Sequence, residues 1–220
     1  MREEASAVER LGQCIAVVSG KGGTGKTSFV AGVGAALALG KRRVLCLDCD
    51  TALRNLDLAL GLTDRALMDF SDVAQGRCPL DTAVVEHPKL PGLYLLTAPV
   101  RSRGRPVTET QMADLLVEVR KRYDYCLLDA PAGLGSGFHL AVCAADRCVV
   151  VTNSDASSLR DAQRTVMELD RFPRRSPSAS WSAPRKTWCV STTRSPSWNC
   201  RWSRCGRRRR RRRSIWKSRT

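Results

Sequence analysis

The chain has 220 residues, ten cysteines and a formal net charge of +16. This length is typical of one domain. The apolar runs are shorter than the ~18 residues that a membrane-spanning helix requires, and the first ten residues are charged, so we expect neither a membrane span nor a secretory leader. These features favour a cytoplasmic protein with reduced cysteines.

The positive charge is concentrated at one end of the chain. Residues 173–220 contain 16 of the 37 Lys and Arg residues, no Asp or Glu, and all five tryptophans. Residues 1–172 carry as many acidic as basic residues. We therefore predict an ordered domain over residues 1–172 and a disordered basic tail, rich in Arg, Ser, Trp and Pro, over residues 173–220.

The strongest motif is G-x-x-x-x-G-K-T at residues 20–27, between an apolar run and a helix-like run. This is the context of a phosphate-binding loop, in which backbone N–H groups surround phosphate oxygens at the positive end of a helix. Lys26 is placed to reach the outer phosphates, and the Thr27 hydroxyl to bind Mg²⁺. A simple glycine turn would not require Gly, Lys and Thr at all of these offsets. The motif predicts a nucleotide site formed by Gly20, Lys21, Gly22, Gly23, Thr24, Gly25, Lys26, Thr27 and Ser28.

Strand-like and helix-like segments alternate along residues 1–172. Apolar runs at residues 14–19, 44–48, 93–97, 125–129 and 148–152 predict strands that are buried on both faces of a parallel sheet. Residues 27–39 predict a helix that Gly40 ends, and residues 108–122 begin with a T-x-x-Q capping box. Asp155 and Ser158 are placed to cap a further helix. The pattern predicts an α/β fold with a doubly wound, mostly parallel sheet.

Acidic residues lie where these strands end. Asp48 and Asp50 follow the second predicted strand, and Asp129 ends a later one. Ligands of doubly wound sheets bind beyond the carboxyl ends of the strands. Asp129 is our candidate for the Mg²⁺ ligand, because Mg²⁺ prefers hard oxygen ligands. Each of these residues, taken alone, is equally typical of a solvated turn.

Cys46 and Cys49 form a C-x-x-C motif, which is found in zinc and redox sites. The pair spans the end of a predicted strand instead of opening a helix, and neither a second pair nor a histidine completes a set of zinc ligands. Most cysteines of residues 1–172 lie inside apolar runs, where cysteine serves as a small buried hydrophobe. We therefore expect neither a metal site nor a redox site at this motif.

Residues 19–27, SGKGGTGKT, resemble the deviant Walker A loop of the MinD/ParA family, which is a family of P-loop ATPases. Residues 47–61 (LDCDTALRNLDLALG), 123–135 (YDYCLLDAPAGLG) and 148–172 (CVVVTNSDASSLRDAQRTVMELDRF) resemble the same family, most closely its MinD branch. The resemblance extends from about residue 13 to residue 172 and then stops.

The resemblance implies an ATP-dependent switch that dimerises across the nucleotide and acts in placement of the bacterial division septum. Its catalytic residues would be Lys21, Lys26 and Asp50: Lys21 reaches the partner's nucleotide, and Asp50 orients the attacking water. Asp48 would support the Mg²⁺ ion and the switch region at residues 54–57. Gly133 would sense the terminal phosphate, and Thr27 and Asp129 would hold Mg²⁺ beside ATP.

Partners also follow from the resemblance: a MinC-type division inhibitor, a MinE-type activator, and the cytoplasmic face of the inner membrane, which family members bind through a C-terminal amphipathic helix. Residues 173–220 match neither this helix nor the family's later strands and adenine-reading Asn motif. We therefore expect a C-terminally incomplete sheet with an uncovered edge at Val149, Val150 and Val151, and hence a poorly soluble chain.

The tail leaves two readings open. Its composition is typical of a shifted reading frame of a GC-rich gene, which would give a non-functional product, and it is also similar to a basic arm that binds nucleic acid through arginine and stacked tryptophan. For residues 1–172, a ParA-like ATPase of DNA or plasmid segregation, or of flagellar placement, is the alternative to a MinD-type switch. The run at residues 53–57, LRNLD, favours the MinD type.

Overall fold

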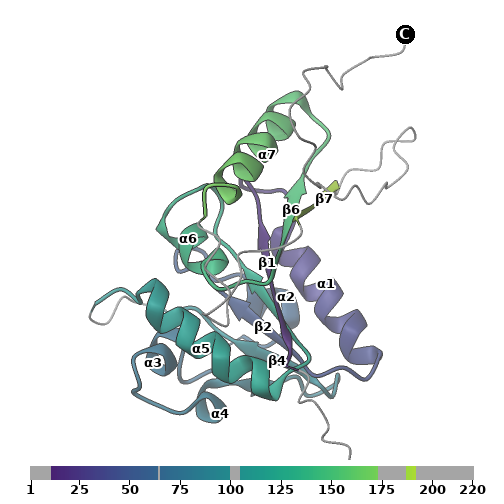
Figure 1. The fold of residues 1–220 in the computed structure, drawn as a ribbon. Helices are drawn as coiled ribbons and strands as arrows, with labels where there is room; N and C mark the ends of the chain where they lie inside the picture. Colours follow the sequence, from purple (N-terminus) through teal and green to yellow (C-terminus); the bar gives the residue numbers. More distant parts are fainter. Residues whose placement is uncertain (1–10, 64, 100–104, 173–186, 192–220) are drawn as a thin grey trace, which may run out of the picture.

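The computed structural model describes residues 11–63, 65–99, 105–172 and 187–191. They form one seven-stranded sheet in the order β3-β4-β2-β5-β1-β6-β7, with helices on both faces (Figure 1). All neighbouring strands are parallel except β3 and β4. The strands are β1 (Gln13–Val18), β2 (Val44–Asp48), β3 (Val85–Glu86), β4 (Leu93–Leu96), β5 (Tyr125–Asp129), β6 (Arg147–Thr152) and β7 (Thr187–Ser191).

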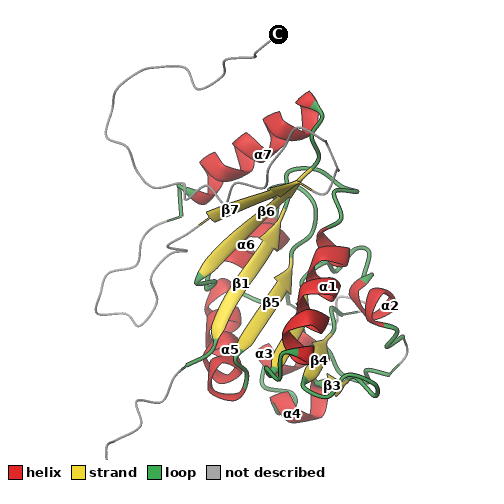
Figure 2. Cartoon of the chain, turned by 90° about the vertical axis from the view of Figure 1, so that its right-hand side faces the viewer, coloured by secondary structure: helices red, strands yellow, loops and turns green. Residues whose placement is uncertain are grey.

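Helices on the two faces of the sheet bury two apolar cores (Figure 2). Helices α1 (Lys26–Leu39) and α2 (Leu56–Leu60) cover one face. The other face is covered by α3 (Phe70–Ala74), α4 (Leu80–Ala83), α5 (Glu109–Arg122), α6 (Ser136–Val142) and α7 (Ala156–Leu169). This arrangement confirms the predicted doubly wound α/β fold.

Strand β2 shows why the central strands are apolar without alternation. Leu45 and Leu47 point into one core, and Val44 and Cys46 point into the other. Successive side chains of a strand face opposite sides, so a strand between two layers of helices needs apolar residues at every position. Helix α1 lies especially close: a Cβ atom added to Gly34 would be 2.7 Å from the Cys46 sulfur.

The predicted elements agree closely with those of the structure. β2 and β5 have the predicted bounds, and β1, β4, β6 and α1 differ from them by one residue at one or both ends. The capping box of α5 is present, with Thr108 accepting from the Gln111 N–H, and Asp155 caps α7 by accepting from the Ser158 N–H. The short elements α2, α3, α4, α6 and β3 were not predicted, because two to seven residues carry little periodic signal.

The prediction of an uncovered edge at Val149–Val151 was wrong. Strand β7 pairs in parallel with β6, with Val149 opposite Trp188 and Val151 opposite Val190. Strand pairing uses backbone groups, and the sequence of β7, TWCVS, contains Thr, Trp and Val, which favour strands. The rest of the predicted disordered tail, residues 173–186 and 192–220, lies outside the described residues.

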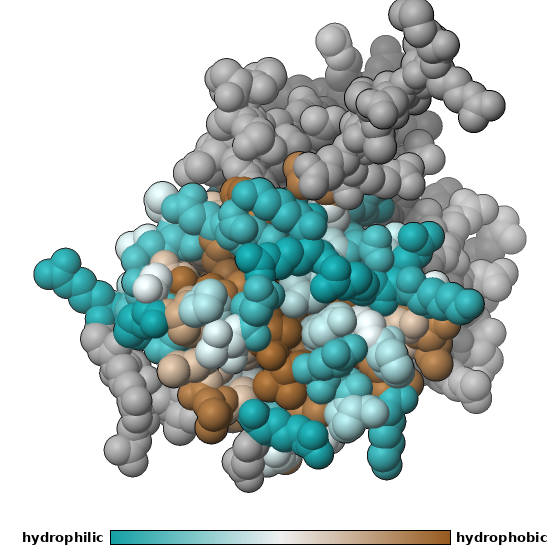
Figure 3. All heavy atoms as spheres, turned by 90° about the horizontal axis from the view of Figure 1, so that it is seen from below, coloured by the Kyte–Doolittle hydropathy of each residue, from teal (hydrophilic) through white to brown (hydrophobic). Residues whose placement is uncertain are grey.

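The end of the molecule where the strands begin is mainly hydrophilic. Figure 3 views this end from below and shows hydrophilic side chains over most of it, with smaller apolar areas between them. Here the Arg43 guanidinium stacks on two aromatic rings, 5.8 Å from the centre of Tyr94 and 5.4 Å from that of Tyr123. Among the described helices, none has the length and apolar character needed to cross a membrane.

A partly buried ion pair joins β1, α5 and the start of β6. Asp146 Oδ2 accepts from the Cys14 N–H (2.7 Å) and from Arg120 Nη2 (3.0 Å). Asp146 returns its own N–H to the Cys14 carbonyl at 2.8 Å. The Arg120 side chain is 6% exposed and the Asp146 side chain 36%, and Arg120 also donates to the Leu116 and Ala144 carbonyls, so removing the carboxylate takes one of several acceptors from a buried guanidinium.

We predict that Asp146→Ala lowers the free energy of unfolding by about 2 kcal/mol, because the buried Cys14 N–H and the Arg120 guanidinium each lose an acceptor. Urea denaturation monitored by circular dichroism measures this change. Lys121→Ala, which breaks the exposed pair with Glu118 on the same helix, is the matched control and should leave the midpoint unchanged. Equal midpoints for Asp146→Ala and wild type would show that Asp146 does not stabilise the fold.

Candidate nucleotide-binding site

The predicted phosphate loop connects the carboxyl end of β1 to the N-terminus of α1. Gly23 (φ 71°) and Gly25 (φ 87°) adopt left-handed backbone conformations that favour glycine. Gly25 is the N-cap of α1 and has no side chain, so the first N–H groups of the helix stay accessible to an anion. Gly22, Gly23 and Ser28 are exposed beside them, whereas Thr24 is buried.

Lys26 is buried at the start of α1, with 8% of its surface exposed. Its Nζ donates to the Ser19 hydroxyl at 2.8 Å. Burial lowers the pKa of Lys26, and the charges of Asp129 and Asp50 oppose this shift. The ammonium group therefore lies near the carboxylates of Asp129 and Asp50, which were predicted to follow the strand ends.

Asp129 and Thr27 are the predicted magnesium ligands. Burial raises the pKa of Asp129 to about 6, while a hydrogen bond from the Thr27 hydroxyl and the charge of Lys26 lower it. Asp129 Oδ1 is buried and has no hydrogen-bond partner among the described residues. A buried oxygen of this kind is costly unless a cation or a donor reaches it.

These two residues fit Mg²⁺. The ion takes one or two oxygen ligands from the protein and completes its octahedron with phosphate and water. The Thr27 hydroxyl and the Asp129 carboxylate, which lie close enough for the hydroxyl to lower the pKa of the carboxyl group, would supply such a pair. Within the described residues, no three His, Cys, Asp or Glu side chains cluster as they would around a metal bound by protein alone.

Asp48 supports the loop that follows β2. Its Oδ1 accepts from the Asp50 N–H (2.8 Å), and its Oδ2 accepts from the Leu56 N–H (3.3 Å). Burial raises the pKa of Asp48 to about 7, and these two backbone hydrogen bonds oppose the rise. Both oxygens thus hold the loop after β2, in which Leu56 belongs to the predicted switch region at residues 54–57; the support of Mg²⁺ by Asp48 stays a prediction.

Asp50 lies in the loop after β2, ahead of the predicted switch region at residues 54–57. Its Oδ1 accepts from the N–H groups of Ala52 (3.0 Å) and Leu53 (3.1 Å), and its charge acts on Lys26. Further along the segment, Arg54 has a left-handed backbone (φ 46°) and pairs with Asp57 at 3.9 Å. A positive φ is uncommon for arginine, so the turn at this residue is strained.

Lys21 is exposed and lies against the N-terminus of α7 in its own chain. Its Nζ donates to the Ser157 hydroxyl at 3.3 Å. Hydrogen bonds from Ser157 and Ser158, with the Lys21 charge, hold the pKa of Asp155 well below its usual range. The contact across a dimer interface that the resemblance implies for Lys21 stays a prediction.

Two further contacts join the phosphate loop to its neighbours. Gly133, which is left-handed at φ 88°, donates its N–H to the Ser19 carbonyl at 3.1 Å. Gly20 packs on α7, because a Cβ atom at this position would lie 2.6 Å from the Asp161 carbonyl oxygen. Sequence analysis assigned no role to Ser19, although it is fully buried and contacts both Lys26 and Gly133.

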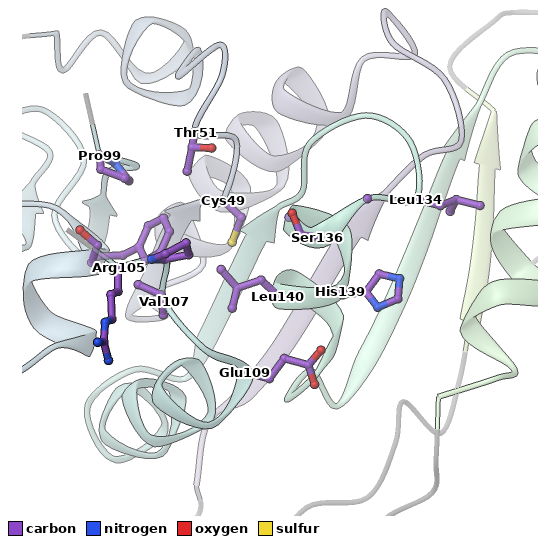
Figure 4. Close-up of a pocket in the computed structure, with 15 residues that line it drawn as sticks. Cys49, Thr51, Pro99, Arg105, Val107, Glu109, Leu134, Ser136, His139 and Leu140 are labelled. Atoms are coloured by element: carbon purple, nitrogen blue, oxygen red, sulfur yellow. The ribbon is translucent and has the colours of Figure 1, made fainter. Parts of the chain in front are cut away.

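A cavity of about 620 Å³ is lined by residues of the loops after β2 and β5 and of helices α3 and α6, and by none of residues 19–27 (Figure 4). Cys49 and Thr51 from the loop after β2 line one part, and Leu134 from the loop after β5 and Ser136 at the start of α6 line another. None of the predicted switch residues 54–57 lines this cavity, whereas residues 134–137, directly after Gly133, do.

Comparison with known proteins gives the family. The family described as "AAA domain" matches residues 12–178. The septum site-determining protein MinD of Bacillus subtilis (strain 168) is 39% identical over 162 residues. This chain belongs to the MinD/ParA family of P-loop ATPases. The alignment covers 73% of this chain and 60% of the Bacillus protein, so the chain spans about three fifths of the length of this MinD/ParA relative.

Solved structures of MinD/ParA proteins share the fold. The MinC:MinD cell division protein complex of Aquifex aeolicus is similar with a TM-score of 0.68 and 36% identity, over 80% of this chain and 68% of that chain. MinD complexed with Mg-ADP from Pyrococcus horikoshii OT3 is similar with a TM-score of 0.67 and 28% identity, over 80% and 69% of the two chains.

We predict that Gly20→Ala lowers the free energy of unfolding by about 2 kcal/mol, because the new methyl group overlaps the backbone of α7. Gly22→Ala is the matched control: its Cβ atom would lie 3.9 Å from the nearest atom, Ala132 Cβ. Thermal denaturation without nucleotide compares the two. Equal losses would show that α7 does not pack on Gly20 in solution.

Proposed function

We propose that this chain binds MgATP at residues 20–28 and acts as an ATP-hydrolysing dimerisation switch of the MinD type in placement of the division septum. The meeting of Lys26, Thr27 and Asp129 at the N-terminus of α1 carries the proposal. An ammonium, a hydroxyl and a carboxylate are the groups by which phosphate loops hold MgATP. The names of the relatives support it, since they are MinD proteins and one structure is complexed with Mg-ADP.

The residues of the loop divide the work of binding. The accessible N–H groups of the glycine loop and of the first turn of α1 bind phosphate oxygens, and Lys26 places a positive charge beside the outer phosphates. Thr27 and Asp129 hold Mg²⁺. The bound ion neutralises charge on the phosphate oxygens as the terminal group is transferred to water.

Asp50 positions the water. Its Oδ1 is engaged with the backbone of its own loop, and we assign Oδ2 to the attacking water molecule. Gly133 carries a single N–H, which it donates to the Ser19 carbonyl. To contact the terminal phosphate, Gly133 has to exchange that bond, so its loop would respond to the nucleotide.

We extend the proposal to partners and location. The MinC:MinD complex of Aquifex aeolicus supports a MinC-type inhibitor as a partner of this chain. A MinE-type activator and a homodimer formed across the nucleotide, with Lys21 at the interface, complete the switch. We place the protein in the cytoplasm, where its nucleotide is available.

We predict that the 220-residue chain binds MgATP and that Lys26→Ala weakens the affinity about 100-fold, because a charge-assisted contact to phosphate is lost. Isothermal titration calorimetry measures both. Asp50→Asn keeps the Oδ1 acceptor and should retain the affinity but abolish phosphate release. Lys89→Ala, which removes an exposed lysine far from the loop, is the control. Equal affinities for wild type and Lys26→Ala would refute the site.

We predict that Lys21→Ala lowers the fraction of dimer formed with MgATP, while a monomer still binds the nucleotide. The reason is that Lys21 is exposed and outside the contacts that hold Lys26. Multi-angle light scattering with and without MgATP measures the dimer fraction, again with Lys89→Ala as control. An unchanged dimer fraction would reject the role of Lys21 at the interface.

A further inference from the structure

Ser19 joins three parts of the nucleotide site. It is the residue directly after β1, and it is fully buried. Its hydroxyl donates to the Lys21 carbonyl at 2.6 Å and accepts from Lys26 Nζ at 2.8 Å. Its carbonyl accepts from the Gly133 N–H at 3.1 Å.

The chemistry of the hydroxyl suits the orientation of an ammonium group. A serine hydroxyl has one proton and two acceptor lone pairs. Because the proton is donated to the Lys21 carbonyl, the lone pairs are available to Lys26. An ammonium group has three N–H donors, so Lys26 keeps two for phosphate oxygens while one is held by Ser19.

A neutral acceptor is better suited to this place than a charged one. A carboxylate here would attract the ammonium strongly and compete with the phosphate for it. Without any acceptor, the buried ammonium would have an unsatisfied donor and would sample other rotamers. The Ser19 hydroxyl fixes the direction of Lys26 and leaves its charge for the nucleotide.

We propose that Ser19 is a positioning residue of the nucleotide site, whose hydroxyl aims Lys26 at the phosphates and whose carbonyl ties the Gly133 loop to the same point. The inference rests on the proposed function in that MgATP is the ligand. It adds a residue that acts through Lys26 and does not itself touch the nucleotide.

Ser19→Ala and Ser19→Thr test this role in the full chain. Ser19→Ala should weaken MgATP affinity about tenfold in calorimetry, because one hydrogen bond to a charged group is lost. Ser19→Thr keeps the hydroxyl and should stay within about twofold of wild type. Thr108→Ala removes the N-cap of α5, far from the site, and controls for stability. It should lower the melting temperature and leave the affinity unchanged.

The outcomes separate this inference from the proposed function. No MgATP binding by the wild type would overturn the proposed function and the inference with it. If Lys26→Ala loses affinity but Ser19→Ala does not, only the role of Ser19 is overturned. Equal losses in Ser19→Ala and Ser19→Thr would also overturn it. If Ser19→Ala does not fold, Ser19→Cys replaces it, since a thiol has similar shape but accepts weakly, and wild-type affinity in that variant would overturn the role.

Discussion

The common end point of three parallel strands is the constraint on which this site depends. Val17 of β1 and Asp48 of β2 both pair with Asp129 of β5, so the three strands end at the same edge of the sheet. The phosphate loop begins two residues after Val17. The loop that leads to the predicted switch region at residues 54–57 begins directly after Asp48. The register of a buried sheet is fixed by its two apolar cores. This register places the phosphate loop, the candidate metal ligand Asp129 and the loop after β2 at the same edge of the sheet.

Burial gives this edge its electrostatic character. Asp48 and Asp129 are each 2% exposed, and Lys26 lies among the same groups. Burial raises the pKa of both carboxyl groups, so their charged forms are disfavoured in the folded chain. A bound cation removes that cost. The protein thus contributes to ion binding before any phosphate arrives, through the placement of charges that its own fold makes unfavourable.

The sequence was sufficient for the parts of the molecule that follow a repeated physical rule. Buried parallel strands are apolar at every position, and a phosphate loop needs glycine, lysine and threonine at fixed offsets, so β2, β5 and the loop were found nearly to the residue. Ser19 escaped, because a small polar residue at a strand end has no pattern that reveals its contacts. Strand β7 escaped for a different reason: an edge strand is held by backbone pairing, which composition does not encode.

The tight contacts of the glycines have a consequence for how sequences of this type vary. A side chain at Gly34 would meet the Cys46 sulfur and a Leu93 methyl group, which are themselves side-chain atoms. A smaller residue at position 46 makes room for a larger one at position 34, so one substitution at each position can compensate for the other. At Gly20 the nearest atoms are the carbonyl group of Asp161, which every residue possesses. No exchange of the side chain at position 161 alone makes room there, and glycine at position 20 is retained for as long as α7 keeps its place.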